Sequence, residues 1–448
     1  MLAIASLQLL FPLCLQAQPV AALPPPESDV APATEWRQWR GPRRDGTVAG
    51  TPWPETLDAE RLKLAWQVEG LGDSYATPLV SETRVFTVGT VGKREEVAAA
   101  YDRLTGELLW ETRWEGAMSV PFFAAKNGSW VRSTPAYDGE ALYIGGMRDV
   151  LVCLDAATGS ERWRVDFVER DGAPLPAFGL VCSPLVVGEA LYLQAGAAVA
   201  KLDKRTGETL WRALDGGQGG GMDSSFSSPV LARLAGEEQL IVQSRTHLAA
   251  LSPATGSALW SQEVQAFRGM NILTPLIFND SIFTTAYGGR AHLYTINRPE
   301  PAEPGPSSEP TASEPGPLFT IAETWTGRAQ GYMTSPLLIE GHAYLFLRSN
   351  RFTCVNMATG EDTYISPPTG DEYWSLVSQA NRILSLSNTG RLRLIPATPG
   401  TYAPAAELDL LKTPTWAHLA ITSPLPPTPT GADLFIRSQT ALHAYHWR

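Results

Sequence analysis

The sequence contains few cysteines and histidines and has no excess of positive charge. Its 448 residues include 35 Lys and Arg against 46 Asp and Glu, which gives a net charge of −11. That balance argues against a nucleic-acid-binding protein, because such proteins present a basic face. No Cys-x-x-Cys-His segment is present, which excludes attachment of a c-type haem. No Gly-x-Ser-x-Gly segment is present, so acyl transfer by a serine at such an elbow has no support.

The few cysteines and histidines form no metal or disulfide pattern in the sequence. Cys14 lies in the apolar N-terminal stretch, and its removal would leave an odd three cysteines. Cys153 and Cys354 fall at the same position of two repeats, where other repeats have Ala, so both are expected to be small buried apolar residues. No histidine pair has metal-ligand spacing on a shared helix. We therefore predict no metal site.

The N-terminal residues 1–17 read as a secretory signal peptide. Their apolar region is too short to span a bilayer. Because no Lys or Arg precedes that region, a mis-assigned start or a buried apolar arm is the alternative. Residues 18–35 are rich in Pro and Ala and are predicted to be a disordered linker. We expect an extracytoplasmic protein, periplasmic or secreted, without a transmembrane segment, and lipidation of Cys14 stays open.

A short sequence motif, here called a phrase, recurs along the chain and divides it into repeats. In residues 151–163 it reads L-V-C-L-D-A-A-T-G-S-E-R-W: an apolar run, an Asp, a Thr-Gly turn and a run that ends in Trp. An apolar run followed by Asp and Gly predicts a strand and a tight turn, so the phrase predicts a β-hairpin. Related phrases occupy residues 99–110, 201–211, 250–260 and 354–364. Each unit begins at a small residue followed by Pro, or an equivalent, and adds two further strands.

Eight copies of the third strand of this unit can be aligned. They end at Asp102, Asp155, Asp203, Ser252, Asn297, Asn356, Pro396 and His446. Four strands per unit are typical of propeller blades and not of helical repeats. The last copy lacks a fourth strand, and the strand at 62–68 stands alone before the first unit. We therefore predict an all-β fold, an eight-bladed β-propeller of four-stranded antiparallel blades over residues 62–448, closed by this N-terminal strand so that sheet edges are removed.

Three segments fall outside the repeats. Residues 36–61 begin W-R-Q-W-R-G-P-R-R-D-G, and because their Trp rings would be costly in water, this Trp/Arg-rich segment is expected to pack on the propeller. Residues 298–317 are dense in Pro and Glu and cannot supply a core, so a disordered, solvated insertion is predicted. Residues 216–221, G-G-Q-G-G-G, precede a blade start and not a helix, which favours a turn over a phosphate-binding loop.

The phrase (Leu)-Asp-x-x-Thr-Gly-Glu-x-x-Trp resembles the repeat of the quinoprotein, or pyrroloquinoline quinone (PQQ)-like, β-propeller superfamily. The opening W-R-Q-W-R-G-P-R-R-D-G and the closing P-T-W-A-H at 414–418 are similar to secreted bacterial members of that superfamily. The resemblance implies that the repeat Trp side chains dock between adjacent blades. This structural role is expected for Trp66, Trp110, Trp163, Trp211 and Trp260.

The superfamily includes enzymes and scaffolds, so the resemblance does not decide the function. Its catalytic members resemble dehydrogenases that hold PQQ beside calcium, with adjacent cysteines against the cofactor and several oxygen ligands. Here no cysteines are adjacent, and no oxygen cluster exists beyond the repeat Asp residues, which are spread round the ring. The resemblance therefore gives no support for PQQ with calcium. The non-catalytic members resemble a scaffold lipoprotein of outer-membrane assembly, which binds a partner protein and no cofactor.

A ligand of a propeller is expected near the central funnel, where the inner strand of each blade begins. The residue three before each blade-start Pro, or its equivalent, should lie there. This rule gives Tyr75, Arg132, Val181, Phe226, Ile272, Met333, Trp374 and Trp416, and His418 is the titratable group nearby. Aromatic rings and an Arg in one ring suit a planar ligand, a carbohydrate or a peptide. The alternative is that these side chains fill the funnel as core.

Two functional hypotheses follow from the sequence. The first is an exported, non-catalytic scaffold that binds another protein or a small planar or carbohydrate ligand, with no cofactor and no catalytic residue. The alternative is a quinoprotein dehydrogenase or a carbohydrate-active enzyme that uses the central funnel. Addition of PQQ and calcium, followed by measurement of the thermal shift and of dye reduction, separates them.

Overall fold

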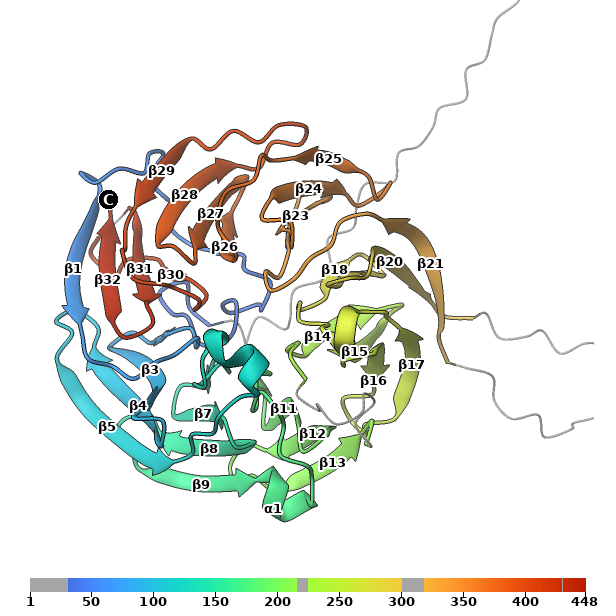
Figure 1. Cartoon of the computed structure of the whole chain (residues 1–448), viewed down its shortest axis with the longest axis horizontal. Coiled ribbons are helices and arrows are strands. Elements are labelled where there is room, and N and C mark those ends of the chain that lie inside the picture. The colour runs from blue at the N-terminus through green and yellow to red at the C-terminus, as the bar shows by residue number, and fades with distance from the viewer. Residues whose placement is uncertain (1–30, 216–224, 300–317, 429) are drawn as a thin grey trace, which may run out of the picture.

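The described part of the chain forms a closed ring of eight β-sheets (Figure 1). The computed structural model describes residues 31–215, 225–299, 318–428 and 430–448. Each sheet has four strands, and their ladders are antiparallel, which confirms the predicted eight-bladed β-propeller. The predicted signal peptide, the linker up to residue 30, the Gly-rich turn at 216–221 and the insertion from residue 300 to 317 lie outside the described residues.

The blades are named A to H in chain order, and their strands are given from the innermost to the outermost. Blade A contains β2 (Leu79–Val80), β3 (Arg84–Val91), β4 (Glu95–Asp102) and β5 (Leu108–Glu115); blade B contains β6 (Ala136–Tyr137), β7 (Ala141–Gly146), β8 (Val150–Asp155) and β9 (Glu161–Asp166); blade C contains β10 (Leu185–Val187), β11 (Ala190–Ala195), β12 (Ala198–Asp203) and β13 (Thr209–Ala213); blade D contains β14 (Val230–Leu234), β15 (Glu237–Gln243), β16 (His247–Leu251) and β17 (Ala258–Glu263).

The second half of the ring repeats this order. Blade E contains β18 (Leu276–Phe278), β19 (Ser281–Thr285), β20 (Ala291–Asn297) and β21 (Thr320–Gly327); blade F contains β22 (Leu337–Ile339), β23 (His342–Phe346), β24 (Phe352–Asn356) and β25 (Asp362–Ile365); blade G contains β26 (Trp374–Gln379), β27 (Arg382–Ser387), β28 (Arg391–Pro396) and β29 (Ala406–Asp409); blade H contains β30 (Ala420–Thr422), β31 (Ala432–Arg437), β32 (Leu442–Trp447) and β1 (Leu62–Val68). The inner strands therefore line the centre of the ring, and the outer strands form its rim.

Helical structure among the described residues is short and lies in connections between blades. These segments are η2 (Phe122–Asn127), α1 (Phe167–Asp171) and η3 (Phe267–Gly269). In the described ranges, no helix has the length and apolar character needed to cross a membrane.

The N-terminal strand β1 completes blade H. It pairs antiparallel with β32, with Leu62 opposite Trp447 and Val68 opposite Leu442. The two ends of the ring are thus joined within one sheet, which leaves no open edge between the first and the last blade. The predicted closure of the propeller is confirmed.

The Asp-x-x-Thr-Gly phrase forms the turn between the third and fourth strands of a blade. In blade A, Oδ1 of Asp102 accepts the backbone N–H groups of Leu104 and Thr105, each at 2.9 Å. This local hydrogen bonding is the reason that Asp favours such turns. Gly106 follows with a φ of 73°, in the left-handed region that residues with a Cβ avoid. The phrase therefore predicts the turn because its residues fix the backbone locally.

Tryptophans on five outer strands pack on these turns in the next blade. The ring of Trp110 in blade A lies so close to Gly159 in blade B that a Cβ on the glycine would lie 2.5 Å from it. The indole N–H of Trp110 also donates to the carbonyl oxygen of Ala156 at 3.1 Å. The equivalent pairs are Trp66–Gly106, Trp163–Gly207, Trp211–Gly256 and Trp325–Gly360. Each of these indole rings links two neighbouring blades.

Trp260 has a different arrangement from the other repeat tryptophans. Its indole N–H donates to Oε1 of Gln239 at 2.7 Å, within its own blade D. In the sequence of the next blade, E, Asn297 and Arg298 are followed by the Pro- and Glu-rich segment, where other blades have the Thr-Gly phrase. Trp325 of blade E, which lies outside the aligned phrases, takes the docking position against blade F.

Residues 34–48 cross one end of the central channel and are called the plug. The guanidinium group of Arg44 donates to the carbonyl oxygens of Ser183 and Pro184 at 3.1 and 2.9 Å. Other contacts of the plug reach Val80 (blade A), Tyr137 (blade B), Thr274 (blade E), Pro336 (blade F) and Ser378 (blade G). The segment predicted to pack on the propeller therefore binds the inner strands of six blades, and its long-range backbone contacts hold it in place.

Candidate functional site

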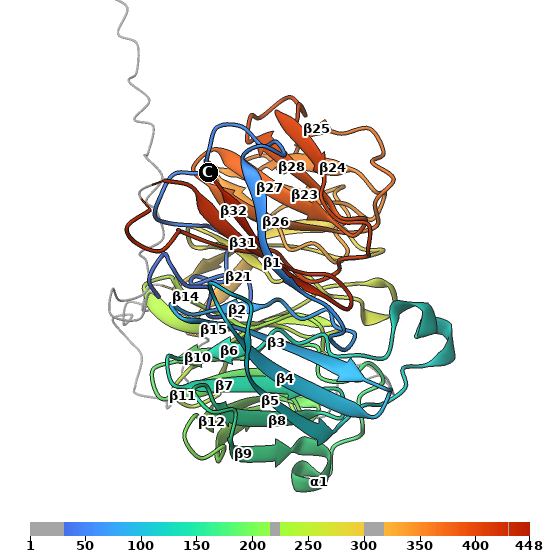
Figure 2. The ribbon, with the colours of Figure 1, turned by 90° about the vertical axis from the view of Figure 1, so that its left-hand side faces the viewer.

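The central channel has two different ends. The plug closes the end that lies close to Val80 and Tyr137, where inner strands finish. At the opposite end, called the mouth, the inner strands begin and the second strands turn into the third, because neighbouring strands of a blade are antiparallel. The connections that carry η2 and η3 belong to the mouth, and Figure 2 shows the teal η2 connection projecting from one face of the ring.

Four aromatic rings and one guanidinium group pack together at the mouth, where blades G, H, A and B meet. The ring centroid of Tyr75 lies 5.6 Å from that of Trp416 and 5.3 Å from that of Trp130. Trp416 also stacks on Tyr373 at 5.7 Å. The guanidinium group of Arg132 lies 5.4 Å from the ring centroid of Tyr75. Burial raises the pKa of Tyr75 to about 12, so its hydroxyl stays protonated at neutral pH.

A line of phenyl rings leads from the η2 connection to the mouth and is called the phenyl track. The ring centroids of Phe122 and Phe123 are 5.8 Å apart, those of Phe123 and Phe178 are 6.5 Å apart, and those of Phe178 and Phe226 are 5.7 Å apart. Phe122 is 91% exposed and Phe123 is 52% exposed, whereas Phe178 and Phe226 are half-buried. The track therefore runs from solvent into the mouth.

A second group of rings lies at the mouth beside η3. The ring of Tyr287 contacts those of Phe267 and Tyr332, with both centroid distances at 5.1 Å. The guanidinium group of Arg348 lies 4.1 Å from the Tyr287 ring centroid and donates to its hydroxyl at 2.8 Å. Arg268 lies 5.2 Å from the Phe267 ring centroid. Two exposed arginines thus stack on aromatic rings there, an arrangement that orders a guanidinium group without neutralising it.

The structure places Tyr75, Arg132, Phe226 and Trp416 at the mouth, but Trp374 lies elsewhere. Trp374 is fully buried in the interface of blades F and G, where its ring stacks on Phe346 at 4.7 Å. Blade G has no Pro at its start, so the count of three residues was made from an equivalent position. That position lies one residue too far along the chain. Tyr373 takes the mouth position instead, because successive side chains of a strand point to opposite faces.

His418 lies inside the channel and not at the mouth. Its ring centroid is 6.4 Å from that of Trp36 and 5.3 Å from that of Trp39, both in the plug. Its Nδ1 hydrogen-bonds to the backbone carbonyl oxygen of Leu419 at 2.9 Å. Burial, assisted by the nearby Arg40 cation, lowers the pKa of His418 to about 3. The imidazole is therefore neutral at neutral pH and packs between the plug and blade H.

Sequence reasoning did not identify Tyr373, Trp130 and the phenyl rings of η2. Trp130, Phe122 and Phe123 lie in the connection at 116–131, which belongs to no repeat phrase. The available signal was the apolar pair Phe122 and Phe123 in an inter-blade connection, because loops that run over a surface rarely carry large apolar side chains without a binding role.

Two carboxylates close to the mouth, Asp371 and Glu96, are already engaged by the protein. Oδ1 of Asp371 accepts the hydroxyl of Thr389 at 2.7 Å, and its Oδ2 forms an ion pair with Arg393 at 3.0 Å. The buried Glu96 accepts the indole N–H of Trp114 at 2.8 Å, and burial raises the pKa of that carboxyl group. Over the described ranges, no group of three His, Cys, Asp or Glu side chains could hold a metal ion. These engaged carboxylates do not fit a quinone held beside calcium, because calcium needs several oxygen ligands that are free to coordinate it.

The three described cysteines offer no support for cofactor chemistry either. Cys153, Cys182 and Cys354 are all buried and unpaired, and each lies in a different blade or connection. Burial raises the pKa of Cys153 to about 12 and that of Cys182 to about 11. The thiols are therefore protonated at neutral pH, and a protonated, buried thiol is not a nucleophile.

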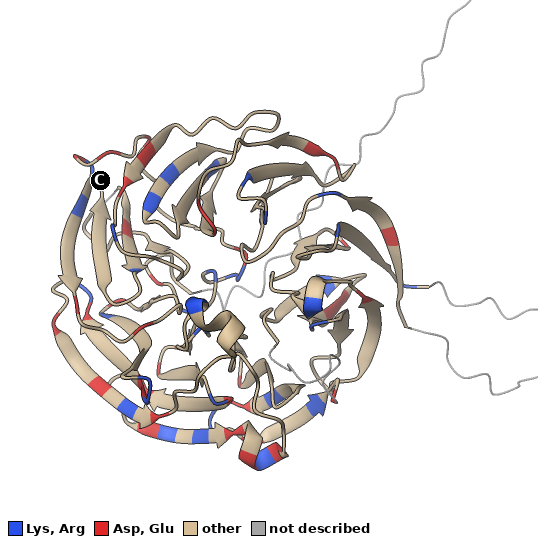
Figure 3. Ribbon diagram, viewed as in Figure 1, with Lys and Arg blue, Asp and Glu red and all other residues tan. Residues whose placement is uncertain are grey.

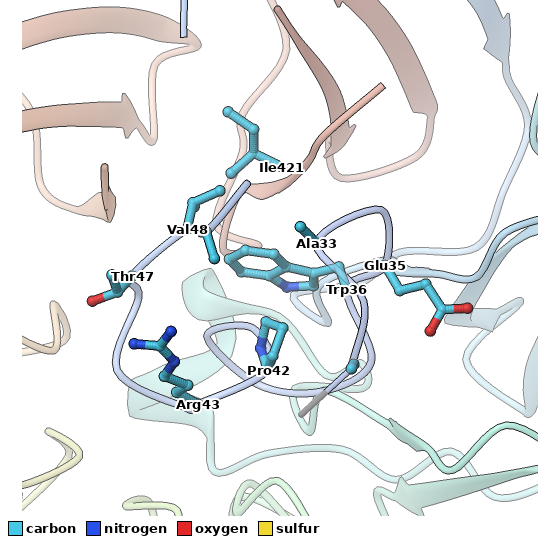
Figure 4. Close-up of a pocket in the computed structure, with 10 residues that line it drawn as sticks. Ala33, Glu35, Trp36, Pro42, Arg43, Thr47, Val48 and Ile421 are labelled. Carbon is cyan, nitrogen blue, oxygen red and sulfur yellow. The ribbon is translucent and has the colours of Figure 1, made fainter. Parts of the chain in front are cut away.

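Two small cavities lie near the seam where the ring closes. One is beside Trp36, Val48 and Ile421, between the plug and blade H, with a volume of about 20 Å³ (Figure 4). The other, of about 40 Å³, is lined in part by Gly89 and Arg437, between blades H and A. Volumes of this size hold about one or two water molecules, so neither cavity has room for a quinone or a sugar.

The sequence profile of a family described as outer membrane protein assembly factor BamB matches residues 93–366, which is more than half of the chain. The chain belongs to this family. The matched range contains the Thr-Gly turns of blades A, B, C, D and F, and it places the chain in the PQQ-like β-propeller superfamily. A search of curated protein sequences finds no match.

Solved structures share the fold at low sequence identity. BamB from Moraxella catarrhalis is 14% identical with a TM-score of 0.57, over 86% of this chain and 98% of that chain. A computationally designed protein, Ika8, is 10% identical with a TM-score of 0.54, over 86% and 99%. A europium-containing methanol dehydrogenase is 12% identical with a TM-score of 0.50, over 93% and 91%. Because proteins of such different kinds share the fold, the mouth and not the fold must identify the function.

Proposed function

We propose that the protein is an exported, non-catalytic scaffold that binds a partner protein through its mouth. The observation that carries this proposal is the exposure of aromatic rings there: 91% for Phe122, 52% for Phe123 and 46% for Phe267. Large apolar side chains that gather on one surface are unfavourable in water, and such surfaces mark interaction sites. Aromatic residues are also enriched at protein interfaces, and membership of an assembly-factor family supports a protein as the partner.

The chemistry of the mouth supports binding over catalysis. Tyr75 and Trp416 pack on neighbouring rings, and the Asp371 carboxylate is held by Arg393. A calcium-bound quinone would have to displace these internal contacts before it could find oxygen ligands. A quinoprotein dehydrogenase or a carbohydrate-active enzyme remains the alternative hypothesis, and no contact at the mouth favours it.

We also propose an extracytoplasmic location, periplasmic or secreted. The support comes from residues 1–17, whose composition is that of a signal peptide, and from membership of the assembly-factor family. Fractionation of cells that express the full chain should recover the protein outside the cytoplasm with residues 1–17 removed. Recovery of the uncleaved chain in the cytoplasm would contradict this part of the proposal.

Site-specific crosslinking tests the binding role of the mouth. A photo-reactive amino acid is placed at Phe123 and, as a matched control, at Leu210, which is 55% exposed on the outer strand β13. The Phe123 position should give one discrete protein adduct in the native host, and the Leu210 position should not. Adducts at Leu210 alone would show that the partner binds the rim and would overturn the assignment to the mouth.

Cofactor addition tests the non-catalytic role independently. The purified protein is incubated with PQQ and calcium, and its melting temperature and its reduction of a dye with alcohols or aldose sugars are measured. We expect no shift of the melting temperature and no dye reduction, because the Asp371 and Glu96 carboxylates at the mouth are already engaged. Saturable dye reduction would overturn the non-catalytic role.

A further inference from the structure

We propose that the mouth binds an extended, acidic segment of a partner protein in which apolar and acidic side chains alternate. This inference rests on the proposed function and adds the chemistry of the partner. Its first basis is the contrast between the chain as a whole, with a net charge of −11, and the cations around the mouth. Lys126 on η2, Arg268 on η3 and Arg348 between β23 and β24 are all exposed. Figure 3 shows Lys or Arg positions in blue on the short helical connections near the centre of the ring.

These three cations are available to a ligand. Within the described residues, no carboxylate forms an ion pair with Lys126, Arg268 or Arg348, whereas many arginines of the rim are paired with neighbouring acids. Glu115, Glu263 and Glu372 are exposed carboxylates at this end of the ring, and Lys93, Arg94 and Arg148 in the turns between second and third strands are further exposed cations. Complementary charge across an interface raises the rate of association and selects the partner. The mouth should therefore select an acidic partner.

The phenyl track has the spacing of an extended chain. Its successive ring centroids are 5.8, 6.5 and 5.7 Å apart. In an extended segment, side chains on one face recur every second residue, or about 6.6 Å. Side chains at positions i, i+2 and i+4 of such a segment can each contact one ring or the gap between two rings, and the intervening side chains then point away from the track.

The inner end of the track adjoins the arginines. The guanidinium group of Arg245 lies 5.5 Å from the ring centroid of Phe226 and donates to the carbonyl oxygen of Arg268. The Arg268 segment therefore lies beside the end of the track, and Tyr287 with Arg348 follows through Phe267. A guanidinium group stacked on a ring keeps several N–H donors for a carboxylate, which Lys cannot offer in a fixed plane. Acidic side chains of the bound segment would reach these donors.

The shape of the track favours a peptide over an anionic membrane surface. Phe122 and Phe123 project into solvent, but Phe178 and Phe226 are half-buried and lie towards the mouth. A flat bilayer surface could reach the first two rings only. A single extended chain is narrow enough to contact all four, so it alone uses the whole track.

Labelled synthetic peptides test the inference on the full mature chain. The probe is a 12-residue peptide that alternates Glu with Leu or Phe, and its comparator has every Glu replaced by Lys. Binding is measured by fluorescence anisotropy at low and at high salt. We expect the Glu peptide to bind at least tenfold more tightly than the Lys peptide at low salt, with the difference reduced at high salt. Equal binding of both peptides, or no binding of the Glu peptide, would overturn the inference.

Charge-matched variants locate the binding surface. Arg268→Glu with Arg348→Glu should weaken binding of the Glu peptide at least tenfold, and Phe123→Ala should weaken it several-fold. The control Lys63→Glu with Arg233→Glu makes the same change in net charge at exposed residues away from the mouth and should alter binding less than twofold. An equal loss in both double variants would show a net-charge effect only and would overturn the inference.

Two outcomes separate this inference from the proposed function. If the Phe123 crosslink captures a protein but the mouth shows no preference for acidic peptides, the scaffold role stands and the acidic segment is refuted. If the chain binds vesicles of phosphatidylglycerol through Phe122 and Phe123 but does not bind the Glu peptide, the mouth is a membrane contact and the inference is again refuted.

Discussion

The two ends of the central channel use the same kinds of side chain for opposite purposes. At the plug, Trp36 and Arg40 are buried, and their surroundings are inner strands of several blades. At the mouth, Phe122 and Arg348 are exposed, one on the connection between blades A and B and the other in the turn between β23 and β24. Aromatic and Arg content therefore does not distinguish structure from recognition in this protein. The burial of a side chain and the identity of its hydrogen-bond acceptors distinguish the two roles.

The arginines at the two ends of the channel also differ in their hydrogen bonding. The guanidinium group of Arg44 donates to the carbonyl oxygens of Ser183 and Pro184 in the interior of the ring. Loss of such a donor leaves a buried acceptor unsatisfied, which is costly. The Arg348 side chain is exposed, so its removal should lower the free energy of unfolding only slightly. Changes at the plug end should therefore alter stability, and changes at the exposed side chains of the mouth should alter binding with little effect on stability.

The largest expected effect comes from removal of residues 1–70, which deletes the plug together with β1. Blade H then loses its outer strand, and the Gly106 turn of blade A loses the Trp66 ring that packs on it. We expect an aggregating product without a cooperative thermal transition. Size-exclusion chromatography and circular dichroism provide the measurement, and removal of residues 1–30 alone serves as the control that should melt normally. A soluble, cooperatively melting product without residues 1–70 would refute closure by β1.

The next effect in size concerns the indole rings that link blades on the plug side. Trp110→Ala should lower the free energy of unfolding by about 3 kcal/mol, the low end for a Trp truncation, because a half-buried ring packed on Gly159 and its hydrogen bond to Ala156 are both lost. Gly159→Ala should also destabilise, since φ is 74° there and the new Cβ would meet the Trp110 ring. Guanidinium chloride denaturation measures both. Leu109→Ala, at a 45% exposed position on the same strand, is the control and should change stability by less than about 0.5 kcal/mol.

The fold could be predicted from the sequence because its determinants are local and repeated. An Asp such as Asp102 or Asp155 fixes its own turn through hydrogen bonds to residues two and three positions ahead. The eight aligned third strands, three of which end in Asp, then reveal eight blades. The pairing of β1 with the last blade follows from the strand count, because the C-terminal repeat supplies only three of the four strands of that blade. The docking of Trp260 could not be predicted from its own phrase. Its expected partner is the Thr-Gly phrase of the next blade, and the sequence of blade E has no such phrase after its third strand.

The mouth could be predicted where a Pro marked the register, and also at Trp416, where no Pro follows. Tyr75 and Phe226 were found by counting from a blade-start Pro, but the count shifted by one residue in blade G and gave Trp374 in place of Tyr373. His418 was assigned to the mouth because sequence cannot show that the plug lies over it. The phenyl track was missed because it joins rings from three separate connections. Contacts of that kind depend on the closed ring and have no local signature.

A pH effect of intermediate size separates the channel interior from the mouth. His418 has a pKa of about 3 in the folded protein and about 6.5 when unfolded, so the unfolded state binds more protons between these values. Stability should therefore be complete above pH 6.5 and should fall as the pH decreases towards 3, by about 2 kcal/mol at pH 5. Denaturation of His418→Gln across this range should show a shallower slope than the wild type.

Other buried groups contribute to the background of that measurement, among them His443, Asp149 and Glu96. Burial lowers the pKa of His443 to about 4, so it contributes a loss in the same direction in both proteins. Burial raises the pKa of Asp149 to about 6, which acts in the opposite sense because the folded state binds more protons between about pH 3.8 and 6. Only the difference between the two slopes reports on His418. Identical slopes would mean that its imidazole is not buried beneath the plug.

The smallest expected effect on stability belongs to the most exposed rings. Phe122→Ala with Phe123→Ala should change the free energy of unfolding by less than about 0.5 kcal/mol, because little apolar area is removed from the folded interior. Tyr373→Ala at the same end should cost several kcal/mol, since Tyr373 is 5% exposed and stacked on Trp416. Chemical denaturation of both variants gives the comparison. A large loss in the Phe122 and Phe123 variant would mean that these rings hold the fold together, and the distinction between a structural end and a binding end would then fail.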